Sequence, residues 1–184
     1  MIILWSILGL LVFAGLVFVA GYALPARWTG QAVATVPAPL ERVWEVAAAV
    51  EHAPVSMRVR SVERLPDVSG LASWVEDIGQ SHVTVVTESS TSPGGETAEG
   101  EPAAAFVRRL TDSEVSMSAR SSVAFERAGT STRLTSDFEI ELPVGTWHVP
   151  LFRWALLFGG GAKSSARSYA KRLAKAAGVA ATFE

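Results

Sequence analysis

The first 24 residues of the chain contain no charged side chain, and this constrains the structure more than any other feature. Ile2 to Leu24 reads IILWSILGLLVFAGLVFVAGYAL, a length that would span about 35 Å as a helix and cross a hydrocarbon core of about 30 Å. Trp5 and Tyr22 lie near its two ends, where amphipathic rings favour the membrane interface. We therefore predict that residues 1–25 form a transmembrane anchor.

A cleaved signal peptide is the alternative, because Gly21 and Ala23 could satisfy a small-x-small cleavage site. However, no Lys or Arg precedes the apolar run, and the run exceeds the usual signal-peptide core of about 7 to 15 residues. The nearest basic residue is Arg27, on the C-terminal side. It favours a single-pass protein of the cell membrane whose globular part is cytoplasmic.

Charge is distributed unevenly along the rest of the chain. Residues 25–141 carry 10 basic and 17 acidic side chains, whereas residues 142–184 carry 6 basic side chains and one acidic one. The basic C-terminal segment either faces an anionic leaflet or is a solvated helix face that balances the acidic part.

Several classes of chemistry are excluded or unsupported. The 184 residues include no cysteine, which excludes a disulfide scaffold, a thiol nucleophile and a Cys-ligated metal site. His52, His82 and His148 have no second ligand at a metal-binding spacing, so we predict no metal site, no cofactor and no catalytic residue. Residues 159–164 lack the spacing of a phosphate-binding loop, and a net acidic domain without interleaved basic and aromatic residues does not indicate a nucleic-acid partner.

Periodicity in the remaining sequence indicates strands followed by a long helix. Alternating apolar residues predict strands at 29–36, 57–65, 71–78, 82–90, 103–110, 115–125 and 134–142. Helical spacing predicts helices at 39–51 and 162–177. Three glycines at 159–161 predict either a helix break or a close backbone contact. Alternation of this kind is typical of an antiparallel sheet with one wet and one covered face.

Four local sequences resemble the polyketide cyclase/dehydrase-like (SRPBCC, START-related) family. They are WTGQAVATVPAPLERVWEVAAAVEHAP at 28–54, Ser73-Trp74-Val75-Glu76, the segment Gly129 to Thr135, and Pro150-Leu151-Phe152-Arg153. The resemblance implies an α+β helix-grip fold: a curved antiparallel sheet of about seven strands around a long C-terminal helix, preceded here by one transmembrane helix. We expect this domain at residues 28–179, with a tail at 180–184.

The resemblance also implies a cavity between the sheet and the C-terminal helix that binds lipids, polyketides, quinones or other apolar molecules. The candidate pocket residues are Val59, Val75, Val85, Met117, Ser121, Val123, Phe125, Leu134, Ser136, Phe138, Ile140, Phe158 and Tyr169. Trp147, Phe152 and Trp154, near the expected cavity mouth, are predicted to contact the membrane interface together with Trp5 and Tyr22. A closed apolar core is the alternative for the inward residues.

Three functions follow from these expectations. The first is a membrane-anchored module that binds a hydrophobic small molecule or lipid, such as an isoprenoid. The second is a cyclase/dehydratase-type enzyme acting on a small polyketide-like substrate, and the third is a structural domain without a ligand. Two or more titratable side chains that converge in the interior would favour the enzyme, whereas a filled interior would favour the structural domain. The sequence does not specify the oligomeric state.

Overall fold

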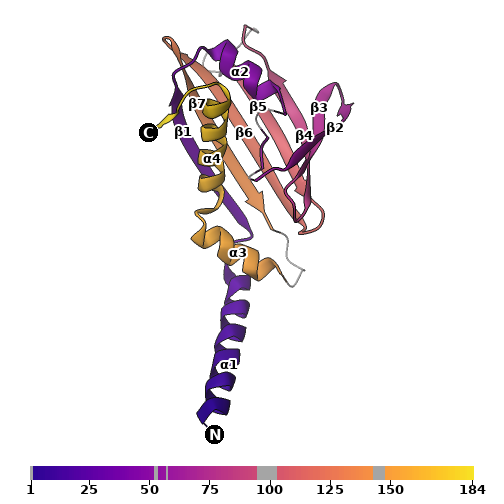
Figure 1. Cartoon of the computed structure of the whole chain (residues 1–184), viewed down its shortest axis with the longest axis vertical. Coiled ribbons are helices and arrows are strands. Elements are labelled where there is room, and N and C mark those ends of the chain that lie inside the picture. Colours follow the sequence, from indigo (N-terminus) through magenta and orange to yellow (C-terminus); the bar gives the residue numbers. More distant parts are fainter. Residues whose placement is uncertain (1, 52–53, 57, 95–102, 143–147) are drawn as a thin grey trace.

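The computed structural model describes residues 2–51, 54–56, 58–94, 103–142 and 148–184. Helix α1 (Ile2–Ala23) projects away from a domain in which a curved antiparallel sheet packs against helix α4 (Gly161–Ala176) (Figure 1). Two shorter helices complete the domain, α2 (Leu40–Ala48) and α3 (Val149–Phe158). The predicted α+β architecture is confirmed.

The described residues form one sheet of eight strands in the order β2-β3-β4-β5-β6-β7-β1-β8. The strands are β1 (Arg27–Val36), β2 (Ser61–Val68), β3 (Leu71–Asp77), β4 (His82–Thr91), β5 (Ala104–Asp112), β6 (Met117–Ala128), β7 (Ser131–Glu141) and β8 (Thr182–Phe183). Every neighbouring pair is antiparallel. The strand count exceeds the expected seven because Thr182 and Phe183, expected in a tail, pair with β1.

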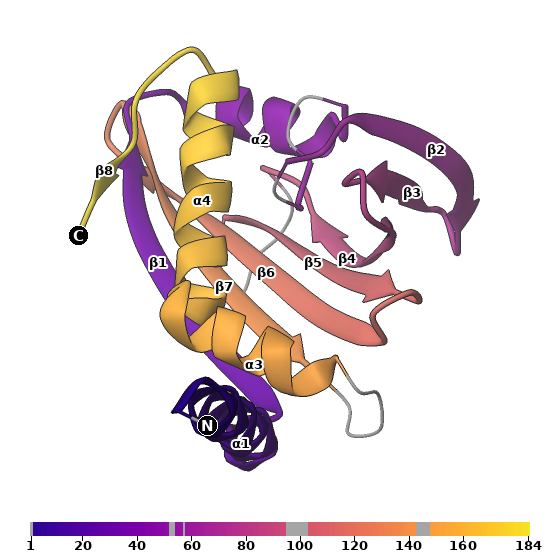
Figure 2. The ribbon, with the colours of Figure 1, turned by 60° about the horizontal axis from the view of Figure 1, so that its bottom comes forward.

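Helix α4 lies over β1 and β7 and buries its small residues there (Figure 2). Ala162, Ala166 and Ala170 are at most 1% exposed. A Cβ atom on Gly30 of β1 would overlap the backbone of Lys163, so the helix and strand backbones are in direct contact at this glycine. Small residues on both elements therefore allow the close approach.

The glycines at 159–161 break the helix and also make a close contact, so both predicted alternatives hold. Helix α3 ends at Phe158 and α4 begins at Gly161. Gly160 and Gly161 have φ values of +78° and +53°, which residues with side chains rarely adopt. A Cβ atom on Gly161 would lie 3.3 Å from the Trp28 ring.

The strand predicted at 57–65 is wrong at its start. Strand β2 begins at Ser61, and Arg58 has a φ of +60°, which is incompatible with an extended strand. Met57 lies outside the described residues. The helix predicted at 39–51 is also shorter, ending at Ala48.

Candidate functional site

Most of the residues predicted to line a pocket lie on the sheet face that α4 covers. Those with at most 7% exposure are Val85, Val123, Phe125, Leu134, Ser121, Ser136, Phe138, Ile140 and, from α4, Tyr169. Met117 lies on the same face of β6 and is half-buried. The structure thus brings these residues together, and their role in binding a ligand stays a prediction.

Three predicted pocket residues lie elsewhere. Val59 precedes β2 and is not part of the sheet. Val75 lies on the opposite face of β3, because the alternation there buries Trp74 and Glu76 instead. Phe158, at the end of α3, is 82% exposed and contributes nothing to the interior.

Aromatic side chains occupy part of the space between the sheet and the helices. Trp44 of α2 stacks on Phe106 of β5 with ring centroids 4.1 Å apart, and Phe125 meets both rings edge-on. Several hollows lined by described residues lie on the outer face of the sheet and along its edges. One of them, of about 490 Å³, is lined by Thr29, Gly30, Gln31, Val107, Arg120, Ser122, Asp137, Phe138 and Glu139. The cavity between the sheet and α4 stays a prediction.

Arg108 of β5 lies beside these rings and is only 3% exposed. Its guanidinium donates to the Tyr169 hydroxyl at 2.9 Å and to the Ala47 carbonyl oxygen at 2.7 Å. The same group lies over the rings of Trp74 and Phe106, at 5.1 and 4.4 Å from their centroids. Among the described residues, no carboxylate lies within ion-pair distance of it. Arg108 is thus a buried cation held by neutral groups.

Three polar atoms around Arg108 have no hydrogen-bond partner in the described part of the protein. They are the Nε of Arg108 itself and the hydroxyl oxygens of Ser121 and Ser136. Ser121 of β6 is the direct cross-strand partner of Arg108. Ser136 of β7 pairs with Val123, two residues along β6 from Ser121. A buried polar atom without a partner costs about 1–3 kcal/mol, so three such atoms close together require an explanation.

Glu76 of β3 is also fully buried, but both its oxygens are occupied. One accepts from the Val55 amide and the Trp74 indole at 2.7 and 2.8 Å, and the other from the Ser56 amide at 2.7 Å. Arg172 of α4 donates to the Val55 carbonyl oxygen at 2.7 Å. Burial lowers the pKa of Arg172, an effect opposed by nearby Tyr169 and Glu76. These groups hold the segment after α2 against the sheet.

From the sequence, Glu76 was named only as part of a family-like motif, and alternation alone did not assign Arg108 to the inner or the outer face. The alternation in β5 contains the signal: Ala104, Phe106 and Leu110 share one face, and Arg108 lies between them. Glu76 has no comparable signal, because its partners are backbone amides of a separate segment.

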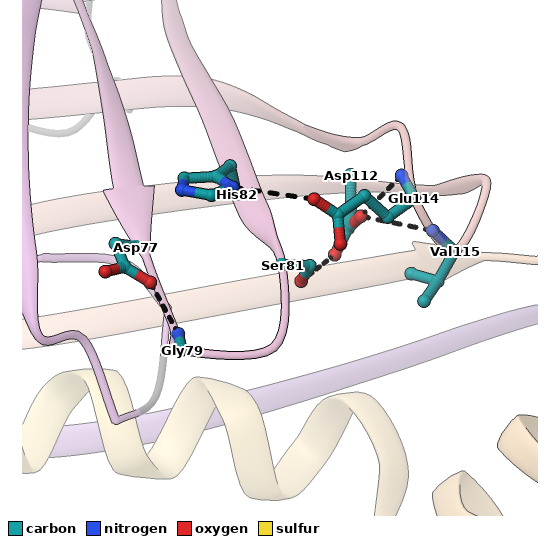
Figure 3. Close-up of polar contacts among 7 residues, drawn as sticks. All are labelled: Asp77, Gly79, Ser81, His82, Asp112, Glu114 and Val115. Carbon is teal, nitrogen blue, oxygen red and sulfur yellow. Dashed lines mark hydrogen bonds and ion pairs between the residues drawn. The ribbon is translucent and has the colours of Figure 1, made fainter.

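A second polar cluster joins two turns, the one between β3 and β4 and the one between β5 and β6 (Figure 3). Both turns lie at the end of the sheet nearer α1 (Figure 1). Asp112, 2% exposed, accepts hydrogen bonds from the Ser81 hydroxyl at 2.6 Å and from the amides of Glu114 and Val115. His82 Nδ1 lies 3.5 Å from Glu114. No group of three possible metal ligands occurs among the residues that the structure describes. These contacts fasten one turn to the other.

Helix α1 is the one helix in the described ranges that is long and apolar enough to cross a membrane. Of the predicted interface residues, Trp5 and Tyr22 are 65% and 41% exposed on α1, and Phe152 is 37% exposed on α3. Trp154 is half-buried, and its indole donates to the Val17 carbonyl oxygen at 2.9 Å. Trp147 lies outside the described residues.

Solved structures from several bacteria share this arrangement at low sequence identity. The hypothetical protein jhp0584 from Helicobacter pylori has a TM-score of 0.58 and 7% identity, covering 80% of this chain and 86% of that one. TTHA0849 from Thermus thermophilus has a TM-score of 0.52 and 18% identity, with coverages of 82% and 97%. Mll3558 from Rhizobium loti has a TM-score of 0.51 and 16% identity, with coverages of 82% and 96%.

The chain has the helix-grip fold. Its sheet and the C-terminal helix α4 stand in the relation that the sequence motifs implied. No protein-family model matches the sequence, and no curated protein matches it either.

Proposed function

We propose that this protein is a membrane-anchored member of the SRPBCC group that binds an apolar molecule carrying one oxygen acceptor, such as a carboxylate or a carbonyl. The observation that carries the proposal is Arg108, a buried cation with an unpartnered Nε and no carboxylate within ion-pair distance among the described residues. A buried charge is costly unless it is paired. A ligand oxygen at Arg108 would provide that pairing.

The surroundings of Arg108 fit the rest of such a ligand. Phe106, Phe125 and Leu134 are buried around the same face of the sheet and would contact an apolar body. The hydroxyl groups of Ser121 and Ser136 would supply further hydrogen bonds to its polar end. A site with an apolar lining and a few polar groups is typical of small-molecule binding.

Ligand access to Arg108 requires the rings packed beside it to move. Trp44 is only half-buried, although it stacks directly on Phe106 beside Arg108. Phe106 lies between the Trp44 ring and the guanidinium, so Trp44 must rotate first to give Phe106 room to move off Arg108. We therefore assign Trp44 as the side chain that moves when the ligand enters.

Helix α1 would hold the domain at the cell membrane, next to a ligand dissolved in the bilayer. Arg153 donates to the carbonyl oxygen of Tyr22, and Trp154 donates to that of Val17. Cleavage after Ala23 would remove both acceptors, which favours a retained anchor over a signal peptide. Arg27, the basic residue nearest the helix, favours a cytoplasmic domain.

A second candidate is an enzyme of the cyclase/dehydratase kind. Arg108 and Tyr169 converge at 2.9 Å, and together they could polarise a substrate carbonyl. Arginine remains protonated and cannot act as a base, and the oxygens of Glu76 are already occupied by three donors. The lack of a free carboxylate at this pair, among the residues described, favours binding over catalysis.

The test is native mass spectrometry of the full chain extracted in detergent. We expect the wild-type protein to retain a small apolar molecule and the Arg108→Met variant to lose it. Arg109→Met is the matched control, because Arg109 is the next residue on β5 and its side chain is 65% exposed. A wild-type protein that carries no such molecule and binds no fluorescent fatty-acid analogue would support the structural domain instead.

A further inference from the structure

Helix α3 has the reverse of the polarity expected for a helix on a soluble domain. Its single charged residue, Arg153, is 2% exposed. Its large exposed side chains are all apolar: Leu151, Phe152, Leu157 and Phe158 are 50%, 37%, 43% and 82% exposed. A contiguous apolar surface of this kind marks an interaction site for another apolar phase.

The position of α3 indicates that its exposed apolar side chains meet the membrane. The helix lies beside the end of α1 in both views, below the sheet and α4 (Figures 1 and 2). The contact is close, because a Cβ atom on Gly21 of α1 would lie 2.6 Å from the Cβ of Pro150. The apolar surface of α3 is therefore continuous with the candidate membrane span.

The contact between α3 and α1 extends along α1 by a distance that fits a helix in the membrane interface. The Trp154 indole donates to the Val17 carbonyl oxygen, and Val17 precedes the last residue of α1, Ala23, by a stretch of about 9 Å at roughly 1.5 Å per residue. Interfacial helices bury their apolar face about 5–10 Å into the boundary between headgroups and acyl chains. The hydrogen bond also satisfies the indole at a depth where water is scarce.

The single charged side chain of α3, Arg153, is hydrogen-bonded at the end of α1. Arg153 donates to the carbonyl oxygens of Tyr22 and Leu24 at 2.8 and 2.9 Å and approaches that of Leu142 at 3.5 Å. The last carbonyls of a helix have no partner within the helix, and a cation there also complements the helix dipole. The guanidinium thus fixes α3 on α1 without exposing a charge to lipid.

We infer that α3 lies in the headgroup and acyl-chain boundary of the leaflet that α1 enters, so that the domain is held on the bilayer surface in one orientation. This inference rests on the membrane anchor of the proposed function. The basic side chains of α4 are not the surface that contacts the membrane. Two of them, Arg167 and Lys171, pack over the Phe183 ring of the edge strand β8. The partner of α3 is the lipid itself.

The test uses the lack of native cysteines. Single cysteines replace Phe158 in α3, Leu10 in α1 and Lys171 in α4, and each carries a nitroxide spin label in the full chain. The protein is reconstituted into vesicles of phosphatidylcholine and phosphatidylglycerol. Electron paramagnetic resonance then compares collisions of each label with oxygen, which partitions into lipid, and with a water-soluble nickel chelate.

We expect the Phe158→Cys label to be shielded from nickel and accessible to oxygen, as the Leu10→Cys label is, and the Lys171→Cys label to show the opposite. A label at residue 158 that behaves like the one at 171, while the label at 10 stays shielded, would overturn the inference and leave the anchor intact. Nickel access at residue 10 would overturn the anchor and the inference together.

Discussion

Arg153 donates a hydrogen bond of 2.8 Å to the backbone carbonyl oxygen of Tyr22, joining the helix after the sheet to the helix before it. The side chain is 2% exposed, and it donates to carbonyls at the end of α1, which have no partner within the helix. Arg153→Met would leave these acceptors unpaired, and we expect it to lower the free energy of unfolding by about 2–4 kcal/mol. Urea unfolding in detergent micelles, followed by tryptophan fluorescence, measures this loss.

Arg133 is the control for this substitution. It pairs with Glu184 at 3.0 Å, and its side chain is 47% exposed. Exposed ion pairs contribute about 1 kcal/mol or less, so Arg133→Met should have a much smaller effect. Equal losses in the two variants would contradict the role assigned to Arg153.

Replacement by alanine should have opposite effects at two glycines of α1, Gly15 and Gly21. A Cβ atom on Gly21 would meet the backbone of Pro150 at 2.9 Å, whereas one on Gly15 would have no atom within 4 Å. Alanine is favoured over glycine in a helix by about 1 kcal/mol, so Gly15→Ala should be neutral or stabilising. Gly21→Ala should instead loosen α3 from α1, measured as faster proteolysis near α3 in micelles.

Gly30 should tolerate no side chain. A Cβ atom there would overlap the backbone of Lys163, and a backbone cannot move aside by changing rotamer. Forced overpacking costs about 1–3 kcal/mol, so Gly30→Ala should lower the free energy of unfolding by that amount. Thermal unfolding measures it, and an unchanged midpoint would show that α4 can shift along β1 without loss.

Substitution of Ser121 distinguishes a ligand-binding site from a purely structural core. Its hydroxyl oxygen is buried without a partner among the described residues, so Ser121→Ala should leave stability unchanged or raise it by about 1 kcal/mol. The same variant should retain less of the bound small molecule if the hydroxyl contacts it. Unchanged retention, measured by native mass spectrometry beside the unfolding curve, would remove Ser121 from the site.

The alternation of apolar residues predicted seven of the eight described strands, with errors at their ends, but it did not always identify the inner face. In β3, the apolar Val75 is predicted to point inward, and its neighbour Glu76 carries a charge. The structure buries Glu76 instead, because the amides of Val55 and Ser56 satisfy its oxygens. Such compensation depends on a distant segment and leaves no periodic signal in the strand itself.

The outward position of Phe158 could not be predicted for a related reason. The run 147–158 is apolar on nearly all sides, so its pattern does not indicate which side meets protein. The contact of Arg153 with the end of α1 decides the orientation, and this contact joins residues 131 positions apart in the sequence. A single charge in an apolar segment is a signal worth examining in other chains of this kind.

The glycines between α3 and α4 have a mechanical consequence. Gly159 and Gly160 separate a helix fastened to α1 from the helix that closes the sheet, and no other residue lies between them. A change in the tilt of α1 against the domain, for example in a bilayer of different thickness, would therefore have to be absorbed at this two-residue joint.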